Sequence, residues 1–328
     1  MGFNHARVYA EMDNVELVGV ADPEPSVRAR ITRRLRVPTF ESYAHMFAET
    51  APNAVSVVVP TTLHHAVAAD VIDAGCHVLV EKPIASTEDE GADLIVRAAD
   101  RGVAFSVGHV ERFNPAVREL KARLNAGELG QIYQVHARRL GPFPARVRDV
   151  GVVIDLATHD VDVMRFLLDS DVIRVYGEIA RRLHTEHEDL LSGLLRFRNG
   201  AIGVLDVNWL TPTKIREVTV TGERGMFVVN YLTQDLTFFK NDWAHQTWHA
   251  GDERQTVSEG DIVKIRVDRQ EALAAELAAF VRAALGESPL EVTGYDGLEA
   301  LRIASALVRS GIEHRHVVLS DDEVIASV

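Results

Sequence analysis

The sequence predicts an α/β protein of two domains, in which a doubly wound parallel sheet is followed by a larger, mainly antiparallel open sheet. Through residue 112, short runs of β-branched residues alternate with longer stretches of helical spacing, which is the pattern of βαβ units. From residue 113 onward, long runs alternate apolar and polar residues, which is typical of antiparallel strands with one solvated face. We therefore expect an α/β domain over residues 1–112 and an α+β domain over residues 113–328.

The first domain contains four apolar runs that are predicted to be buried parallel strands. They cover residues 15–22, 55–60, 77–83 and 104–110. Each run is apolar on both faces, as strands covered by helices on both sides must be. Helices fill the intervals, for instance over residues 64–75 and 87–102, where apolar residues recur at helical spacing.

The second domain contains longer runs with a period of two. They cover residues 131–140, 190–200, 201–210, 215–225 and 226–232. Asn199, Gly200, Gly222 and Gly225 stand between them, where hairpin turns need residues that tolerate positive φ. These runs predict an antiparallel sheet.

Composition excludes several classes of protein. Of the 328 residues, 47% are hydrophobic and 25% charged, and no run of apolar residues is long enough to cross a membrane. The net charge of −13 argues against nonspecific binding to nucleic acid. The single cysteine, Cys76, excludes an internal disulfide and a cysteine-rich metal site, and it suits a reducing cytoplasm. The histidines of residues 184–187 (HTEH) have no evident third ligand, so we expect no metal.

A carboxylate near the N-terminus has the spacing of a dinucleotide site. Dinucleotide folds place an acidic residue about 20 positions beyond the last glycine of their phosphate-binding turn, where it binds the adenosine ribose. Asp22 stands 20 positions after Gly2 and therefore has the expected spacing, although an Asp before Pro23 equally suits a turn. Its charge would repel a ribose 2′-phosphate, which favours NAD over NADP, while Arg28 nearby leaves NADP open.

A second motif, VEKPIA (80–85), ends a predicted strand at the sheet edge where open α/β folds bind ligands. Lys82 before a proline resembles the EKP signature of the glucose-fructose oxidoreductase, inositol dehydrogenase and MocA (Gfo/Idh/MocA) family. Four other segments resemble family motifs in the same order: PTTLH (60–64), GHVERFNP (108–115), DLATHDVD (155–162) and VTGYDGLEALRIASALVRSG (292–311). Val59, Thr61 and Ala157 depart from the family's usual residues.

The resemblance implies a Rossmann domain with NAD as cofactor, and a second domain that binds a sugar substrate. It places a set of residues at the cofactor: Gly2, Asp22, Pro60, Thr61, His64, Glu81 and Lys82. It also implies oxidation or reduction of a sugar or cyclitol carbinol. Because large sheets with an open face commonly pair with another copy, we expect a homodimer or homotetramer.

The chemistry of carbinol oxidation requires a general base within hydrogen-bond reach of the hydroxyl oxygen. Lys82 and His159 are the candidates, and the sequence leaves their division of roles open. The spacing of Asp155, His159 and Asp162 predicts one polar helix face, opposite a core face of Val152, Leu156, Val163 and Leu167. By resemblance, His159 takes the hydroxyl proton, Asp155 orients the substrate and Lys82 polarises the oxygen.

Substrate recognition is predicted from cationic residues near this helix. Arg138, Arg139, Arg146 and Arg148 lie just before it and suit a pyrophosphate, although a solvated loop or intersubunit ion pairs would explain them equally. Lys214 and Arg216 would add anion contacts, and Trp209 would either cover the sugar or pack in the core. The resemblance adds Arg112 and Asn114 as substrate-binding residues.

Three segments, VGHVERFNP (107–115), RVRDVGVVIDLATHDVD (146–162) and NWLTPTKIREVTVTG (208–222), resemble the branch of the family that oxidises the 3-hydroxyl of UDP-N-acetylglucosamine. Two alternatives stay open: a dehydrogenase of an inositol or another free sugar in the same family, and a non-catalytic nicotinamide-binding regulator. A regulator would have no need of Lys82, Asp155 and His159 together.

The first residues, MGFNHARV, resemble the tail of the family's GxGxxGxxHAR turn, with Gly2 as its third glycine. We therefore expect the natural reading frame to start about 8–15 residues upstream, a length that would hold the first strand and the turn with the two other glycines. Without that strand, the strands ending at Asp22 and Pro60 would lack the neighbour between them. The alternative is a family member that binds NAD without the glycine loop.

Overall fold

The computed structural model describes residues 1–144, 150–183, 186–249 and 252–319. The chain forms two compact units, the first from residues 1–110 and 271–298, the second from 111–270 and 299–328. The predicted boundary at 112/113 therefore differs by two residues, and a segment late in the chain returns to the first unit. It does so because helix α8 (Ala272–Ala284) packs its apolar face against α1 (Gly2–Ala10) and strand β4 (His77–Glu81).

The first unit contains two separate parallel sheets. Strand β1 (Val20–Ala21) pairs with β2 (Thr39–Phe40), while β3 (Ala54–Val57), β4 and β5 (Phe105–Gly108) form a second sheet in that order. Of the strand predicted over residues 15–22, only β1 is extended and paired, and it is half-exposed rather than buried. Strands β4 and β5 are buried as predicted, whereas β3 is half-exposed because β4 is its single partner among the described strands.

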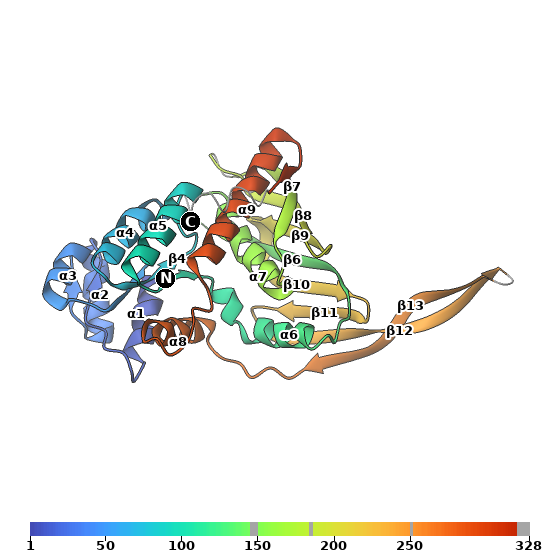
Figure 1. The fold of residues 1–328 in the computed structure, drawn as a ribbon, viewed down its shortest axis with the longest axis horizontal. Helices are drawn as coiled ribbons and strands as arrows, with labels where there is room; N and C mark the ends of the chain where they lie inside the picture. The colour runs from blue at the N-terminus through green and yellow to red at the C-terminus, as the bar shows by residue number, and fades with distance from the viewer. Residues whose placement is uncertain (145–149, 184–185, 250–251, 320–328) are drawn as a thin grey trace. The chain divides into compact units, whose positions relative to one another are not determined.

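The helices of this unit include α-helices close to the two that the sequence predicts over residues 64–75 and 87–102 (Figure 1). They are α1, α2 (Pro25–Leu35), α3 (Tyr43–Thr50), the short 3₁₀ turn η1 (Thr61–Leu63), α4 (His64–Asp73), α5 (Glu88–Arg101) and α8. Local signals explain the ends of α5: Thr87 and Glu90 form a capping box, and Gly102 ends the helix with φ of 64°.

The second unit is built on a nine-stranded sheet of order β13-β12-β11-β10-β6-β9-β8-β7-β14. Its strands are β6 (Ile132–Pro142), β7 (Val172–Ala180), β8 (Leu190–Phe197), β9 (Ile202–Asn208), β10 (Leu210–Gly222), β11 (Gly225–Asn230), β12 (Asp235–His249), β13 (Asp252–Ile265) and β14 (Val317–Val318). Neighbouring strands are antiparallel except for β6 and β9, which confirms the predicted sheet type. The hairpin β12–β13 extends beyond the other strands (Figure 1).

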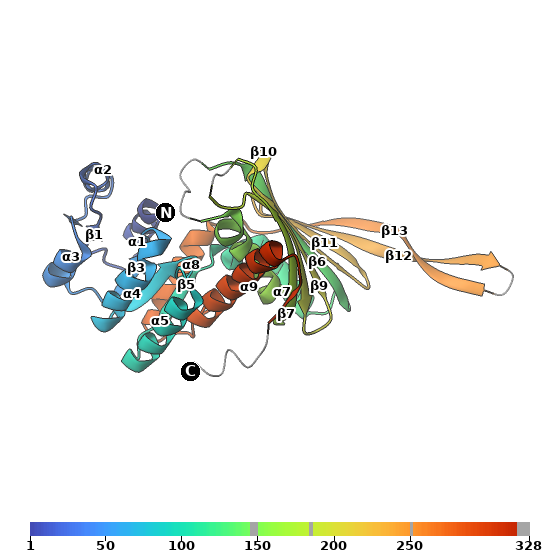
Figure 2. The ribbon, with the colours of Figure 1, turned by 90° about the horizontal axis from the view of Figure 1, so that it is seen from above.

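Helices cover one face of this sheet (Figure 2). They are α6 (Pro115–Asn125), α7 (Thr158–Leu168) and the part of α9 (Gly294–Glu313) that follows residue 298. A π-helical turn, η3 (Val153–Ala157), leads directly into α7. The predicted core face of this segment is confirmed, because Val152, Val163 and Leu167 are buried and Leu156 packs against the same cluster. Within the described residues, no helix combines the length and apolarity needed to cross a membrane.

Candidate active site

Lys82 follows β4 directly, and the carboxylate before it is held on two sides. The Oε1 atom of Glu81 lies 2.9 Å from Nε2 of His5 in α1, and Oε2 accepts the backbone N–H of Lys82 at 3.3 Å. The Lys82–Pro83 peptide bond is cis. Burial by itself raises the pKa of Glu81, but the hydrogen bond and charge of His5, together with Lys82, outweigh burial and lower this pKa. Glu81 is therefore a fixed negative charge beside a half-buried lysine.

His64 connects the loop after β3 to the loop after β4. Its Nδ1 lies 2.7 Å from the carbonyl oxygen of Pro83 and its Nε2 lies 3.0 Å from that of Val59, and the side chain is buried. Burial lowers the pKa of His64, and the two carbonyl groups offset this only in part. His64 therefore holds together, through its two ring nitrogens, the two loops that are predicted to bind the cofactor. Its direct contact with the cofactor stays a prediction.

The N-terminal turn of α1 lies beside the end of β3. A Cβ atom on Gly2 would be 3.9 Å from Cβ of Val58, and no side chain of the described residues caps the first turn of the helix. At the end of β1, Asp22 is half-exposed and accepts the backbone N–H of Glu24 at 2.9 Å. Arg28 donates instead to the carbonyl oxygens of Asp22 and Pro23.

These residues fit NAD. An uncapped helix N-terminus presents N–H groups and a positive dipole end to a pyrophosphate. The Asp22 carboxylate suits ribose hydroxyls, and Arg28 is held by backbone carbonyls rather than presented as a partner for a 2′-phosphate. Pro60 is exposed and Thr61 half-exposed in the loop between β3 and α4, where a ligand can reach them.

In the second unit, Asp155 and His159 are both half-exposed on consecutive turns of the η3–α7 segment. Arg216 of β10 lies within electrostatic reach of Asp155, and its guanidinium donates to the carbonyl oxygens of Leu140 and Ile215. Burial and the charge of Arg139 lower the pKa of Arg216, against the opposing effect of nearby carboxylates. Asp155 thus lies near Arg216, and both Asp155 and His159 are accessible to a ligand.

Asp162, predicted to share the face of Asp155 and His159, is instead buried. Arg112 donates to both its carboxylate oxygens, at 2.8 and 2.6 Å. The predicted polar face is therefore wrong at Asp162, because the buried Arg112 guanidinium requires a carboxylate partner. Asn114 caps α6 by accepting the Ala116 N–H and donates to the Tyr231 carbonyl oxygen, both at 3.1 Å. Arg112 and Asn114 are thus engaged within the protein, and their direct contact with substrate stays a prediction.

The arginines before α7 differ in their surroundings. Arg139 lies in β6, is 4% exposed, and binds Asp160 through two nitrogens at 2.7 and 3.0 Å and Glu111 at 3.0 Å. It is therefore not an exposed anion donor, contrary to expectation. Arg138 is half-exposed and 3.8 Å from Glu217, while Arg146 and Arg148 lie outside the described residues.

Trp209 is 2% exposed and meets Phe143 edge-on, with ring centroids 5.5 Å apart, so it is a core residue. His184 of the HTEH segment lies outside the described residues, and those that are described contain no group of three potential metal ligands.

One residue of the site, His5, had no predicted role. The only signal for it was its place in the HAR segment after Gly2.

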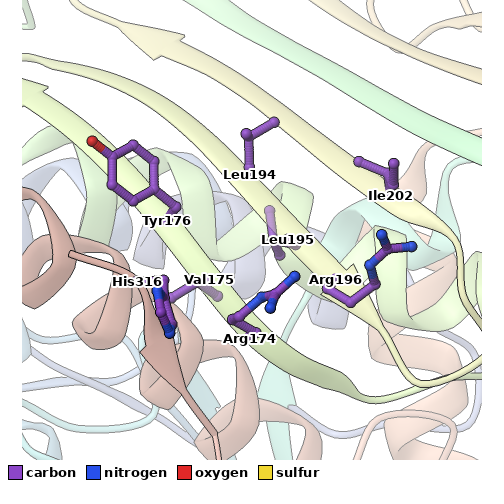
Figure 3. Close-up of a pocket in the computed structure, with 8 residues that line it drawn as sticks. All are labelled: Arg174, Val175, Tyr176, Leu194, Leu195, Arg196, Ile202 and His316. Atoms are coloured by element: carbon purple, nitrogen blue, oxygen red, sulfur yellow. The ribbon is translucent and has the colours of Figure 1, made fainter.

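A shallow pocket lies elsewhere in the second unit, on the sheet face opposite the helices. Figure 3 shows Tyr176, Leu194 and Ile202 standing on the neighbouring strands β7, β8 and β9. Arg174, Arg196 and His316 complete its polar lining. It contains none of the predicted catalytic residues, so it is a separate feature from the site.

The fold, a parallel-sheet unit with helices followed by a unit built on a large, mainly antiparallel sheet, is typical of a dinucleotide-dependent oxidoreductase. The chain belongs to the Gfo/Idh/MocA family. Residues 1–109 match the family model described as "Oxidoreductase family, NAD-binding Rossmann fold", and residues 117–228 match the GFO/IDH/MocA C-terminal domain. The protein is thus an oxidoreductase that acts on CH–OH groups with NAD as its cofactor.

Two relatives illustrate the range of the family. The chain is 29% identical to the UDP-N-acetylglucosamine 3-dehydrogenase of Acidithiobacillus ferrooxidans over 95% of this chain and 94% of that protein. A solved structure of that enzyme, GnnA, aligns with a TM-score of 0.80 at 27% identity, covering 94% of this chain and 93% of the other. The scyllo-inositol 2-dehydrogenase (NAD(+)) of Bacillus subtilis is 26% identical over 72% of this chain and 73% of its own length.

Proposed function

We propose that this protein oxidises the 3-hydroxyl of UDP-N-acetylglucosamine to the 3-keto nucleotide sugar, with NAD as the hydride acceptor. The observation that carries the proposal is the 29% sequence identity to the A. ferrooxidans enzyme over almost the whole of both proteins. Coverage alone does not single out this enzyme, because the MocA protein of Rhizobium meliloti matches 93% of this chain at 26% identity. Similarity to the inositol dehydrogenase covers about three quarters of each chain. Because one fold hosts many substrates, the proposal needs a direct test.

The proposed mechanism assigns one task to each accessible residue. Bound NAD would supply the hydride acceptor for the carbinol carbon. His159 accepts the proton of the hydroxyl group, Lys82 donates a hydrogen bond to the same oxygen as the carbonyl forms, and Asp155 orients the substrate. The half-exposed state of all three side chains supports these tasks. The opposite division, with Lys82 as the base, is the alternative that the kinetics of single variants would separate.

Arg146 and Arg148 are proposed to bind the pyrophosphate of the substrate, and Arg112 and Asn114 to line the sugar site. Arginine suits this task because its planar fork donates two parallel hydrogen bonds to phosphate oxygens. Contacts of this kind bind ground state and transition state alike, so their loss raises KM more than it lowers kcat.

The test is a substrate screen that follows NADH formation at 340 nm. The panel contains UDP-N-acetylglucosamine, UDP-glucose, free N-acetylglucosamine, glucose and scyllo-inositol. Reduction of the product with borodeuteride followed by mass spectrometry locates the ketone. Turnover of UDP-N-acetylglucosamine with label at C3 supports the proposal. Turnover of inositol or glucose alone contradicts it, and NAD binding without turnover on any carbinol favours the regulator.

Two variants sharpen the screen. Arg146→Ala and Arg148→Ala should raise KM for the nucleotide sugar and leave kcat nearly unchanged. Lys240→Ala is the matched control, because Lys240 is an exposed cation 3.6 Å from Asp261 on a different part of the sheet. Unchanged kinetics with altered assembly would instead indicate an intersubunit role for the arginines.

We also propose a homodimer or homotetramer in the cytoplasm. The outer face of the nine-stranded sheet leaves Leu194 50% and Ile202 37% exposed on neighbouring strands, which favours burial against another subunit. The single reduced cysteine, Cys76, suits the cytoplasm. Light scattering would measure the assembly, and an unchanged mass for Leu194→Asp would argue against this face as the contact.

A further inference from the structure

We infer that His5 is a positioning residue for Lys82, acting through the carboxylate of Glu81. The inference rests on the proposed catalytic role of Lys82. Helix α1 carries His5 and also the N-terminal turn that suits the cofactor's pyrophosphate. The His5–Glu81 hydrogen bond therefore joins the cofactor-binding helix to the strand end that presents the lysine.

The geometry leaves the Glu81 carboxylate little freedom. One oxygen is held by His5 at 2.9 Å and the other by the backbone N–H of Lys82 at 3.3 Å. On the neighbouring strand, a Cβ atom at Gly108 would lie only 3.2 Å from the carboxylate, so β5 approaches as closely as a glycine allows. The backbone N–H of Lys82 thus binds the carboxylate of Glu81, which His5 of α1 and the close approach of Gly108 in β5 hold in one position.

The tautomer of His5 follows from its partner. An ionised carboxylate only accepts hydrogen bonds, so Nε2 must carry the proton that Glu81 receives. His5 is 2% exposed, which shields this hydrogen bond from water. A side chain that keeps a donor at the same place should therefore keep the function, and glutamine, whose amide nitrogen superimposes on Nε2, is that side chain.

Helix α1 offers a matched control. Tyr9 also ties this helix to the sheet, through a hydrogen bond of 2.8 Å to the hydroxyl of Ser56 in β3. Tyr9→Phe removes one partly buried hydrogen bond from the same helix without touching Glu81. A merely structural role of His5 predicts that His5→Ala and Tyr9→Phe behave alike.

The first measurement needs no substrate. The lysines of the chain are Lys82, Lys121, Lys214, Lys240 and Lys264. Reductive ¹³C-methylation of the intact protein gives each a separate methyl resonance, and the loss of one signal in Lys82→Arg assigns Lys82. We expect this resonance to shift in His5→Ala and in Glu81→Gln, to return to its original position in His5→Gln, and to stay unchanged in Tyr9→Phe.

The second measurement separates catalysis from binding. We expect His5→Ala to lower kcat on the order of 10- to 100-fold, the effect of misplacing a catalytic group by about 1 Å, with KM for NAD and NADH affinity by fluorescence nearly unchanged. His5→Gln should restore most of kcat. If His5→Ala does not fold by circular dichroism, Glu81→Gln, which preserves shape, carries the same test.

A Lys82 resonance that does not move in a folded His5→Ala or Glu81→Gln protein would overturn the inference, as would an equal shift in Tyr9→Phe. Failure of the proposed function has a different signature, because UDP-N-acetylglucosamine would then not be oxidised while the resonance shifts would remain.

Discussion

Burial divides the charged side chains of this protein into two groups with different tasks. Lys82, Asp155 and His159 are half-exposed and can meet a ligand. Arg112, Arg139 and their aspartate partners are nearly inaccessible and bind each other through two hydrogen bonds per pair. A charge removed from water needs such a partner, whereas a catalytic charge must exchange its partners during the reaction. Exposure is thus the property that separates the two groups.

The first prediction concerns the accessible group. Lys82→Ala and His159→Ala should each lower turnover by roughly two to four orders of magnitude, the usual effect of removing a general acid or base. NAD affinity, measured by fluorescence titration, should change little. His65→Ala is the control, because His65 is paired with Asp93 at 2.7 Å on the surface of the first unit. Near-normal turnover in either variant would remove that residue from the mechanism.

The second prediction follows from the buried imidazole of His64. Burial lowers its pKa below the ordinary value of 6.5, so the unfolded chain binds the proton more readily than the folded one. Between the lowered pKa and pH 6.5, the free energy of unfolding should therefore fall as the pH falls. Urea unfolding from pH 8 to pH 5 would measure this. His64→Gln should show a shallower fall, and an identical slope would assign the acid sensitivity to other groups.

At the scale of elements, one arginine connects three parts of the second unit. Arg139 of β6 binds Asp160 of α7 and Glu111 of the 3₁₀ turn η2 (Val110–Phe113), and its guanidinium lies 5.2 Å from the ring centre of Tyr231. Burial by itself lowers the pKa of Arg139, but the charges of Asp160 and Glu111 outweigh burial and raise it. The helix that carries His159 is therefore anchored to the sheet by an ion pair directly adjacent to that histidine.

The third prediction tests this anchor. Arg139→Ala should destabilise the protein by about 3–5 kcal/mol, because it leaves a buried carboxylate without its partner. Arg138→Ala, one residue away, should cost less than about 1 kcal/mol, since Arg138 is half-exposed and 3.8 Å from Glu217. Chemical denaturation of both variants gives the comparison. Equal losses of unfolding free energy in the two variants would contradict the argument that burial makes the Arg139 ion pair more important than the exposed one.

Asp160 allows a cross-check on the same anchor. If Arg139 and Asp160 stabilise the fold as a pair, the double variant Arg139→Met with Asp160→Leu should be more stable than the sum of the single losses predicts. Strict additivity of the two free-energy changes would mean that the residues act independently.

At the scale of the whole molecule, the chain passes from the first unit to the second, back to the first, and then to the second again. Residues 271–298 return to the first unit, where Leu277 and Phe280 of α8 pack against Val8 of α1 and Leu79 of β4. The cofactor-binding unit is therefore completed by a late segment of the chain. Folding of this unit therefore brings α8 against α1, whose nearest ends, Ala10 and Ala272, are 262 positions apart in the sequence.

The fourth prediction concerns this unit as a ligand-binding body. NAD at about 100 times its Kd should stabilise the folded protein by about 2.7 kcal/mol and raise Tm accordingly. Asp22→Ala should reduce the rise of Tm with NAD, because the carboxylate suits the ribose hydroxyls. It should also bring the Tm values with NAD and with NADP closer together, because the carboxylate repels a 2′-phosphate. Asp100→Ala, an exposed aspartate at the end of α5, is the control. An unchanged preference in Asp22→Ala would place the selectivity elsewhere.

The sequence by itself determined the architecture and the accessible candidates. Periodicity distinguishes parallel from antiparallel strands because burial on one face or two is a local pattern, and it predicted β4, β5 and five strands of the large sheet: β6, β8, β9, β10 and β11. It did not predict β7, β12, β13 or β14. The motifs also placed Lys82 at the end of β4, and Asp155 and His159 on successive turns, since spacing along one element fixes such relations.

The tertiary structure alone decided which charges pair with which. Asp162 binds Arg112 across 50 positions of sequence, Asp160 binds Arg139 across 21, and His5 meets Glu81 across 76. Helical spacing predicted Asp162 on the accessible face because it counts only neighbours on the same helix. Burial of Asp162 depends on an arginine delivered by another element, and no local pattern encodes that encounter. The same reason explains why β1 and β3 are half-exposed: exposure of a strand depends on which strands pair with it, and pairing is a property of the folded chain.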